Sequence, residues 1–277
     1  MSEQTTLAAL ADKFDAFLVD QFGVLLDGSE AYPGAPEALA ELARRGKRIV
    51  ILSNSGKRSS ANAARLVAKG FDRASFEIVM SSGEAAHAAL SGRIGTEIAS
   101  GAPVMILSRD DDLSAIEGLD LRMADRPEDA RLVIIAGSRG EEIPIERYAE
   151  MLQVPASAGV ACLCTNPDMT MLTARGPAFG AGRIAGLYEE LGGTVEYVGK
   201  PHPLIYEMAA QALGDISPDR IVCIGDSPAH DIRGGRTAGY KTVLVRTGIH
   251  ADEVLEDVLA DSPASDRPDF ILPAFAL

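Results

Sequence analysis

The chain has 277 residues, of which 47% are hydrophobic and 24% charged, and its net charge at pH 7 is −14. This length allows two domains or one large α/β domain, and the apolar content is sufficient for a sizeable core. The acidic balance argues against a nucleic-acid-binding protein, which needs a basic face. A small anionic substrate remains compatible with it, because a bound metal and a few lysines reverse the field locally.

No apolar run approaches the length of a transmembrane helix, and residues 1–14 lack the cationic start and apolar core of a signal peptide. Cys162, Cys164 and Cys223 lie in apolar, strand-like runs and are expected to be buried, reduced thiols. These features favour a soluble cytoplasmic protein without a membrane partner.

In chain order, the first informative stretch is the apolar run from Phe17 to Val19, which predicts a buried strand. A carboxylate, Asp20, stands where the run stops, and Gly23 allows a sharp turn just beyond it. Ligands of open α/β sheets bind outside the carboxyl ends of the strands, so Asp20 is a candidate site residue. The alternative is a loop carboxylate that caps the next turn, and this stretch alone does not decide between them.

The next segments alternate between helical and strand-like patterns. This alternation predicts a parallel sheet with crossover helices. The expected elements are a helix over 37–45 that ends at Gly46, a strand over 48–52, a helix over 59–69 and a strand over 77–80.

From about residue 82 to 183 the sequence predicts short strands with one intervening helix. The regular alternation of helices and strands then returns. We therefore predict one α/β core, residues 1–82 and 183–277, interrupted by an inserted α/β domain, residues 83–182. Within the insertion we expect strands over 104–107, 132–136 and 161–164 and a helix over 145–152. In the returning core we expect helices over 184–191, 204–213 and 232–238 and strands over 196–198, 220–224 and 242–245.

Polar clusters stand at four of the expected strand ends. Parallel strands bring their carboxyl ends to one edge of a sheet, so clusters far apart in sequence can converge. Taken singly, each has a simpler explanation as a helix cap, a turn or a solvated lysine, but their shared placement favours a common site. The clusters are Asp20, Ser53-Asn54, Gly199-Lys200-Pro201 and the segment 225–231, Gly-Asp-Ser-Pro-Ala-His-Asp.

The chemistry of these residues is mutually consistent. Asp20 and Asp226 would repel each other unless one were protonated or a cation lay between them, and an all-oxygen site with room for water suits Mg²⁺. The hydroxyl of Ser53, the amide of Asn54 and the ammonium of Lys200 are groups that bind a phosphate dianion.

These motifs, with the sequences Val-Asp-Gln-Phe-Gly-Val-Leu over 19–25 and Leu-Ser-Asn-Ser over 52–55, resemble those of the haloacid dehalogenase superfamily. The specific likeness is to the class IIA cap branch, which contains NagD-type and p-nitrophenyl-phosphate phosphatases. Thr165 to Asp168, followed by the glycine-rich segment 176–182, resembles the return from cap to core in that branch. The resemblance covers about residues 14–244 and implies a Rossmannoid core with an inserted class IIA (C2) cap.

The resemblance also implies a role for each matching residue. Asp20 would be the nucleophile that forms a covalent aspartyl-phosphate. Asp20, Asp226 and the backbone carbonyl of Phe22 would hold Mg²⁺. Asp231 would orient Lys200 or a metal-bound water, and His230 beside it is interpreted as a residue at the start of a helix.

The resemblance also implies how the phosphoryl group would be held. Ser53 and Asn54 would bind it, and Lys200 would neutralise charge on it and on Asp20. The implied substrate is a small phosphorylated metabolite, with specificity set in the cap around Asn166, Asp168 and segment 176–182. Cap-to-cap dimers are common among such relatives, so a homodimer through the cap is compatible with the resemblance.

One position departs from the family pattern. Phosphatases of this family usually carry an acid–base aspartate two residues after the nucleophile, where this chain has Phe22. The ring, which we expect to be buried, cannot transfer a proton, and general acid–base catalysis is typically worth about 10²–10⁴-fold. Asp27 could substitute, although Asp27-Gly28 is also an ordinary turn pair, the interpretation that we favour.

Three functions therefore stay open. The first is a Mg²⁺-dependent phosphatase that is slow on poor leaving groups. The second is a catalytically weak protein that binds a phosphorylated ligand. The third is a haloacid dehalogenase-like hydrolase, in which the aspartate attacks carbon and an aromatic residue also follows the nucleophile by two positions; the pair Asp226 and Asp231 counts against it, because it indicates a metal.

Overall fold

The computed structural model describes residues 2–173, 176–260 and 262–277 and divides into two compact units. The first comprises Met1–Ser53, Ser59–Met80 and Lys200–Leu277, and the second Asn54–Arg58 and Ser81–Gly199. Both contain a parallel sheet with helices packed against it, in agreement with the predicted α/β class. None of the described helices is both long and apolar enough to cross a membrane.

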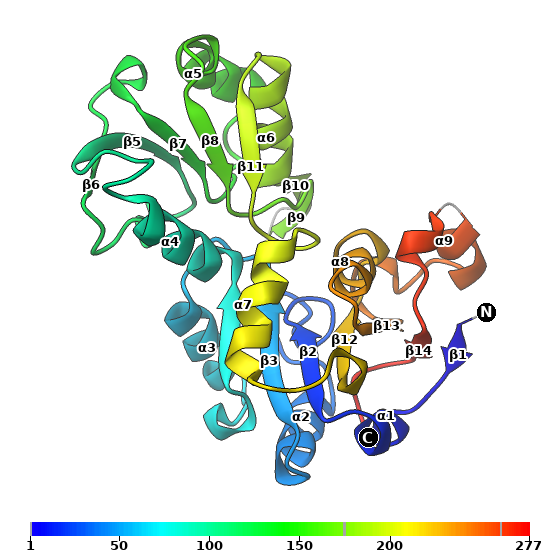
Figure 1. Ribbon diagram of the computed structural model, residues 1–277. Coiled ribbons are helices and arrows are strands. Elements are labelled where there is room, and N and C mark those ends of the chain that lie inside the picture. The colour runs from blue at the N-terminus through cyan, green and yellow to red at the C-terminus, as the bar shows by residue number, and fades with distance from the viewer. Residues whose placement is uncertain (1, 174–175, 261) are drawn as a thin grey trace. The chain divides into compact units, whose positions relative to one another are not determined.

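The first unit is built on a seven-stranded sheet with the order β1-β14-β13-β12-β2-β3-β4 (Figure 1). Its central strands are parallel, with β2 between β12 and β3. The strands are β1 (Glu3–Gln4), β2 (Ala16–Asp20), β3 (Arg48–Ser53), β4 (Ile78–Ser81), β12 (Ile221–Gly225), β13 (Lys241–Val245) and β14 (Phe270–Leu272). The helices are α1 (Leu7–Lys13), α2 (Ala35–Arg44), α3 (Ser59–Ala68), α7 (Pro203–Leu213), α8 (Arg233–Thr237) and α9 (Leu255–Ala260).

The central strands are buried on both faces, which explains their continuous apolar runs. Alternate residues of β2 point to opposite sides: Phe17 and Val19 pack in a core with α1, α2 and α3, and Leu18 packs in a second core with α7. Helices thus cover both faces of this sheet, and its middle strands are held rigidly between two apolar layers.

The second unit contains a five-stranded parallel sheet with the order β11-β8-β7-β5-β6 and a separate antiparallel hairpin. Residues of α5 and α6 pack in one core with β7 and β8. The strands are β5 (Ala102–Leu107), β6 (Leu121–Met123), β7 (Leu132–Ile135), β8 (Ala161–Cys164), β9 (Thr170–Thr173), β10 (Gly176–Phe179) and β11 (Thr194–Tyr197). The helices are α4 (Ser82–Arg93), α5 (Ile145–Ser157) and α6 (Ala181–Glu190).

The helix and strand predicted over 184–198 do not return to the first sheet. The strand, β11, pairs in parallel with β8, and α6 packs in the core of the second unit. The prediction of these two elements as parts of the core was wrong, because the same helix–strand alternation continues through both sheets. The domain limits proposed from the sequence, 1–82 with 183–277 and 83–182, remain a prediction.

Candidate active site

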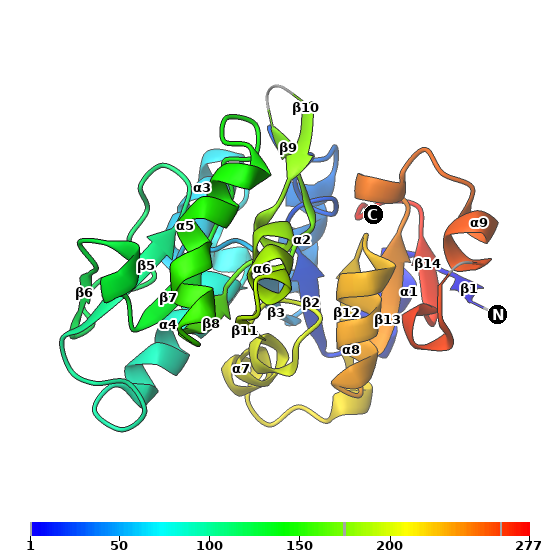
Figure 2. The ribbon, with the colours of Figure 1, turned by 90° about the horizontal axis from the view of Figure 1, so that it is seen from above.

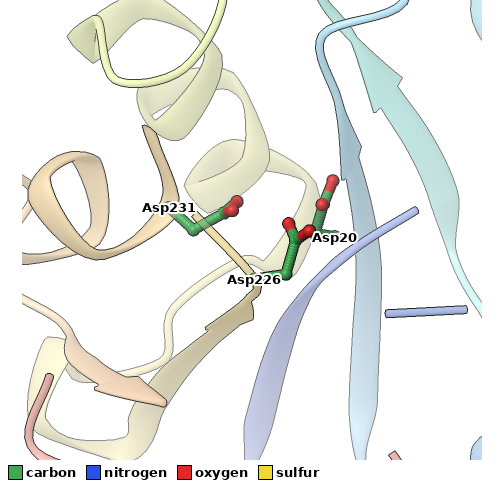
Figure 3. A group of neighbouring side chains, drawn as sticks. All are labelled: Asp20, Asp226 and Asp231. Atoms are coloured by element: carbon green, nitrogen blue, oxygen red, sulfur yellow. The ribbon is translucent and has the colours of Figure 1, made fainter. Parts of the chain in front are cut away.

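Three neighbouring strands of the first unit end in the predicted site residues. Asp20 is the last residue of β2, Ser53 is the last of β3, and Asp226 directly follows β12. The register pairs Val19 with Ile224 of β12 and Asp20 with Leu52 of β3, so the three strand ends lie side by side. In Figure 3 the carboxylates of Asp20 and Asp226 lie close together at this edge, with Asp231 beside them.

Lys200 joins two of these carboxylates. Its Nζ lies 2.5 Å from Oδ1 of Asp20 and 2.7 Å from Oδ1 of Asp231, and all three side chains are buried. Burial disfavours the ammonium, but Asp20 and Asp231 nevertheless raise the pKa of Lys200 above its usual value. Lys200 therefore carries its charge at neutral pH and fixes Asp20 from one side.

Asp231 is held in place from the other direction. It lies in the helical turn Pro228–Ile232, and its Oδ2 accepts a hydrogen bond from the backbone N–H of Ser227 at 3.1 Å. A side chain at Gly225 would overlap it, since a Cβ there would lie 2.0 Å from Cγ of Asp231. The glycine that ends β12 is thus needed for Asp231 to reach Lys200.

Asp226 is surrounded by main chain. Its Oδ2 accepts a hydrogen bond from the N–H of Ile249 at 2.8 Å. Gly23 and Gly248 both have positive φ, and a Cβ on either would lie within 2.1 Å of that same oxygen. The chain that carries Phe22 and Gly23 therefore passes against the Asp226 carboxylate, which is where a backbone ligand to a shared cation would be needed.

The cluster has an excess of negative charge. Carboxylate oxygens of Asp20, Asp226 and Asp231 all lie within 4.8 Å of one another, and Lys200 is the ammonium within it. Burial raises the pKa of Asp20 well above its usual value, with Lys200 opposing it; burial and then Asp231 raise the pKa of Asp226 to about 6. A bound cation would offset this cost, and oxygen ligands of this kind fit a hard divalent ion.

The predicted phosphate-binding pair divides between the two units. Ser53 is buried at the end of β3 in the first unit. Asn54 is grouped with the second, where its Nδ2 donates to Oδ1 of Asp168 at 2.8 Å and its Oδ1 accepts from Ser82. The structure thus joins Asn54 to Asp168, one of the two residues expected to set specificity.

The segment after Asp20 corrects one expectation and agrees with another. Phe22 is not buried: the residue is 36% exposed, and the guanidinium of Arg65 lies over its ring, with Cζ 5.5 Å from the ring centroid. Asp27 forms a turn, accepting hydrogen bonds from the N–H groups of Ser29 and Glu30, which lower its pKa. An exposed carboxyl group with a lowered pKa is a poor proton donor at neutral pH.

Two further contributors were missed by sequence reasoning. The loop after β13 supplies Gly248 and the N–H of Ile249, and the hydroxyl of Thr247 donates to the carbonyl of Gly23. The signal was present in Thr247-Gly248, which follows an apolar strand after a single residue and so resembles the placement that singled out the other strand ends. Arg65 gave no such signal, because it lies inside a helix.

Comparison with known proteins identifies the family of the chain. A model of the family described as haloacid dehalogenase-like hydrolase matches residues 17–122, and a related HAD-hydrolase-like model matches 197–276. The sugar-phosphatase AraL of Bacillus subtilis is 31% identical over 83% of this chain and 82% of its own length. The chain belongs to the haloacid dehalogenase-like hydrolase family.

Other members extend the likeness over the whole chain. Chronophin of Mus musculus is 29% identical over 97% of this chain and 94% of its own. A haloacid dehalogenase-like hydrolase from Brucella suis superposes with a TM-score of 0.83 at 27% identity, covering 99% of both chains. Glycerol phosphate phosphatase from Mycobacterium tuberculosis, solved in complex with magnesium, gives a TM-score of 0.76 at 26% identity over 96% of this chain and 77% of its own. The expected class IIA branch is thereby confirmed.

Proposed function

We propose that this protein is a Mg²⁺-dependent phosphomonoester hydrolase that acts on a small phosphorylated metabolite through an aspartyl-phosphate on Asp20. The observation that carries the proposal is the buried Lys200 ammonium between Asp20 and Asp231, with Asp226 completing the cluster at the strand ends. The printed names of the relatives, a sugar-phosphatase and a glycerol phosphate phosphatase, support the same reaction class.

In the first half-reaction, a carboxylate oxygen of Asp20 attacks phosphorus while the bond from phosphorus to the leaving oxygen breaks. Oδ1 of Asp20 accepts hydrogen bonds from Lys200 and from the N–H of Gln21, which fix the orientation of the carboxylate. In the second, water attacks phosphorus, the bond from phosphorus to the Asp20 oxygen breaks, and inorganic phosphate leaves with the protons of the water, which regenerates the Asp20 carboxylate. Ser53, Asn54 and Lys200 bind the phosphoryl oxygens in this proposal.

Asp20, Asp226 and the carbonyl of Phe22 would hold the metal. When bound, Mg²⁺ would neutralise charge on the phosphoryl oxygens and on the two carboxylates. Asp231 holds Lys200 in place without itself contacting the reacting atoms. Its contact with Lys200 at 2.7 Å makes it a positioning residue in this proposal.

Phe22 limits the leaving groups that this site can expel. With no proton donor at that position, the leaving oxygen departs as an anion or receives its proton from elsewhere. Rates should therefore depend steeply on the pKa of the leaving group: acyl and p-nitrophenyl phosphates should react readily and sugar phosphates slowly. Phe22 cannot accept a proton from the attacking water either, so release of p-nitrophenol should show a burst before the slower steady state.

The test is a panel of phosphate monoesters, acyl phosphates and 2-haloacids, assayed with and without Mg²⁺, on the wild type and on Phe22→Asp. The aspartate should accelerate alkyl phosphates by up to about 10²-fold and flatten the dependence on leaving-group pKa, while Phe22→Asn controls for loss of the ring. Metal-independent release of halide would instead establish the dehalogenase reaction. A wild type and Phe22→Asp variant that are both inert to every phosphate, yet bind one, would establish a phospho-ligand-binding protein.

A further inference from the structure

The pair formed by Phe22 and Arg65 lies within the first unit, beside the nucleophile. Phe22 follows Asp20 by two residues, just beyond the end of β2, where the chain turns between Gln21 and Leu26. Phe22 is more than one third exposed, although its neighbours Gln21, Gly23 and Val24 are all buried. Because Gly23 lies against the Asp226 carboxylate, Phe22 is an exposed residue in the segment that borders the carboxylate cluster.

Arg65 extends from α3 onto the ring of Phe22. Its Cζ is 5.5 Å from the ring centroid, and its Nη1 is 3.5 Å from Oδ1 of Asn62. Among the described residues it forms no ion pair, whereas Arg58, one residue before the same helix, is held by Glu84 through two bonds of 2.8 Å. A guanidinium that lies over an aromatic ring can still use its N–H groups for bidentate bonding to a planar anion.

We propose that Arg65, supported by the ring of Phe22, binds a carboxylate on the leaving group of the substrate. The inference rests on the proposed phosphatase function and narrows it to phosphate esters of hydroxy acids. The positive charge of Arg65 is also complementary to the carboxylate cluster. The buried carboxylates of Asp20, Asp226 and Asp231 carry excess negative charge, which would repel an acidic substrate. Arg65 is half-buried, and its charge would offset that repulsion for a leaving group bound beside Phe22.

The test compares substrates that differ only in this group. The pairs are 2-phosphoglycolate with 2-hydroxyethyl phosphate, and 3-phosphoglycerate with glycerol 3-phosphate. We expect Arg65→Gln to lower the preference in kcat/KM for the acid of each pair by about 10–100-fold, mainly through KM, because a bidentate charged contact is lost. Arg65→Lys should retain part of the preference for the acids. Arg65→Glu should instead favour 2-aminoethyl phosphate over 2-phosphoglycolate and 2-hydroxyethyl phosphate.

Arg73→Gln is the matched control. Arg73 also lies over a phenylalanine ring of the first unit, at 4.8 Å from the centroid of Phe76, but it is not adjacent to the nucleophile. It should leave the substrate preference unchanged. A shift below twofold in Arg65→Gln, or an equal shift in Arg73→Gln, would overturn the carboxylate subsite while leaving the phosphatase proposal standing.

A second arm separates the subsite from turnover. Calorimetric binding of 2-phosphoglycolate and 2-hydroxyethyl phosphate is measured on Asp20→Asn, with and without Arg65→Gln. The acid should bind more tightly, and this difference should disappear in the double variant. If no phosphate is hydrolysed but the difference in affinity is found, the phosphatase function is refuted and the carboxylate subsite is supported. Equal binding of the two ligands would refute the subsite.

Discussion

The substitution Asp226→Asn should make the protein more stable when no metal is bound. Asp226 is buried, and burial together with Asp231 raises its pKa from 3.8 to about 6. A shift of this size corresponds to about 3 kcal/mol for keeping the carboxylate ionised at neutral pH. Asparagine is nearly isosteric and its oxygen can still accept the hydrogen bond from Ile249, so the substitution removes the charge without opening a cavity.

The sign of this effect depends on pH. Below the unfolded pKa of 3.8, Asp226 is protonated in both states and the two proteins should be equally stable. As pH rises from about 4 to about 7, the folded wild type retains a proton that the unfolded chain has lost, so its stability falls relative to the variant. The advantage of Asp226→Asn should therefore grow to about 3 kcal/mol and then level off.

The assay is urea denaturation in EDTA at several pH values, repeated with Mg²⁺. Magnesium at about 100 times its Kd should return about 2.7 kcal/mol to the wild type alone. Asp215→Asn, an exposed carboxylate of the same unit, should show neither effect. A variant no more stable than wild type in EDTA at pH 7 would refute the argument that the cluster carries uncompensated negative charge.

Three further substitutions test the remaining assignments. Asp20→Asn should abolish phosphate turnover without unfolding the protein, and mass spectrometry should find no adduct where the wild type carries one on Asp20; full activity would end the aspartyl-phosphate mechanism. Lys200→Met should cost about 3–5 kcal/mol in EDTA, measured by denaturation, because it strands two buried carboxylates; an unchanged stability would contradict the ion-pair geometry. Asp27→Asn keeps the turn and should leave turnover of p-nitrophenyl phosphate unchanged, and a 10²-fold loss would identify Asp27 as the missing acid.

The sequence predicted the elements whose burial is strongest. The apolar runs that became β2 and β12 are enclosed by helices on both sides of the sheet, so their composition reflects their position directly. Short strands at the edges were missed, among them β1, whose two residues are exposed. The helix α4 was missed as well, because its sequence of alanines, glycines and serines has almost no amphipathic pattern.

The site was predictable to the extent that it depends on strand ends. Asp20, Ser53 and Asp226 follow buried runs, and parallel pairing of β12, β2 and β3 is enough to bring them to one edge. The exposure of Phe22 could not be predicted in this way. An aromatic residue within Gln-Phe-Gly-Val-Leu looks like part of the apolar run, but it lies beyond the end of β2, where the chain has already begun to turn.

Contacts between loops distant in sequence were beyond prediction. Gly23 and Gly248 are 225 residues apart, yet both lie against Oδ2 of Asp226 and each has a backbone conformation that favours glycine. These close approaches exclude bulk around a carboxylate that burial already makes costly to ionise. The fold therefore holds Asp226 in an arrangement that is unfavourable by itself and that a bound cation would relieve, which is the arrangement expected of a site selected for binding a metal and not for stability.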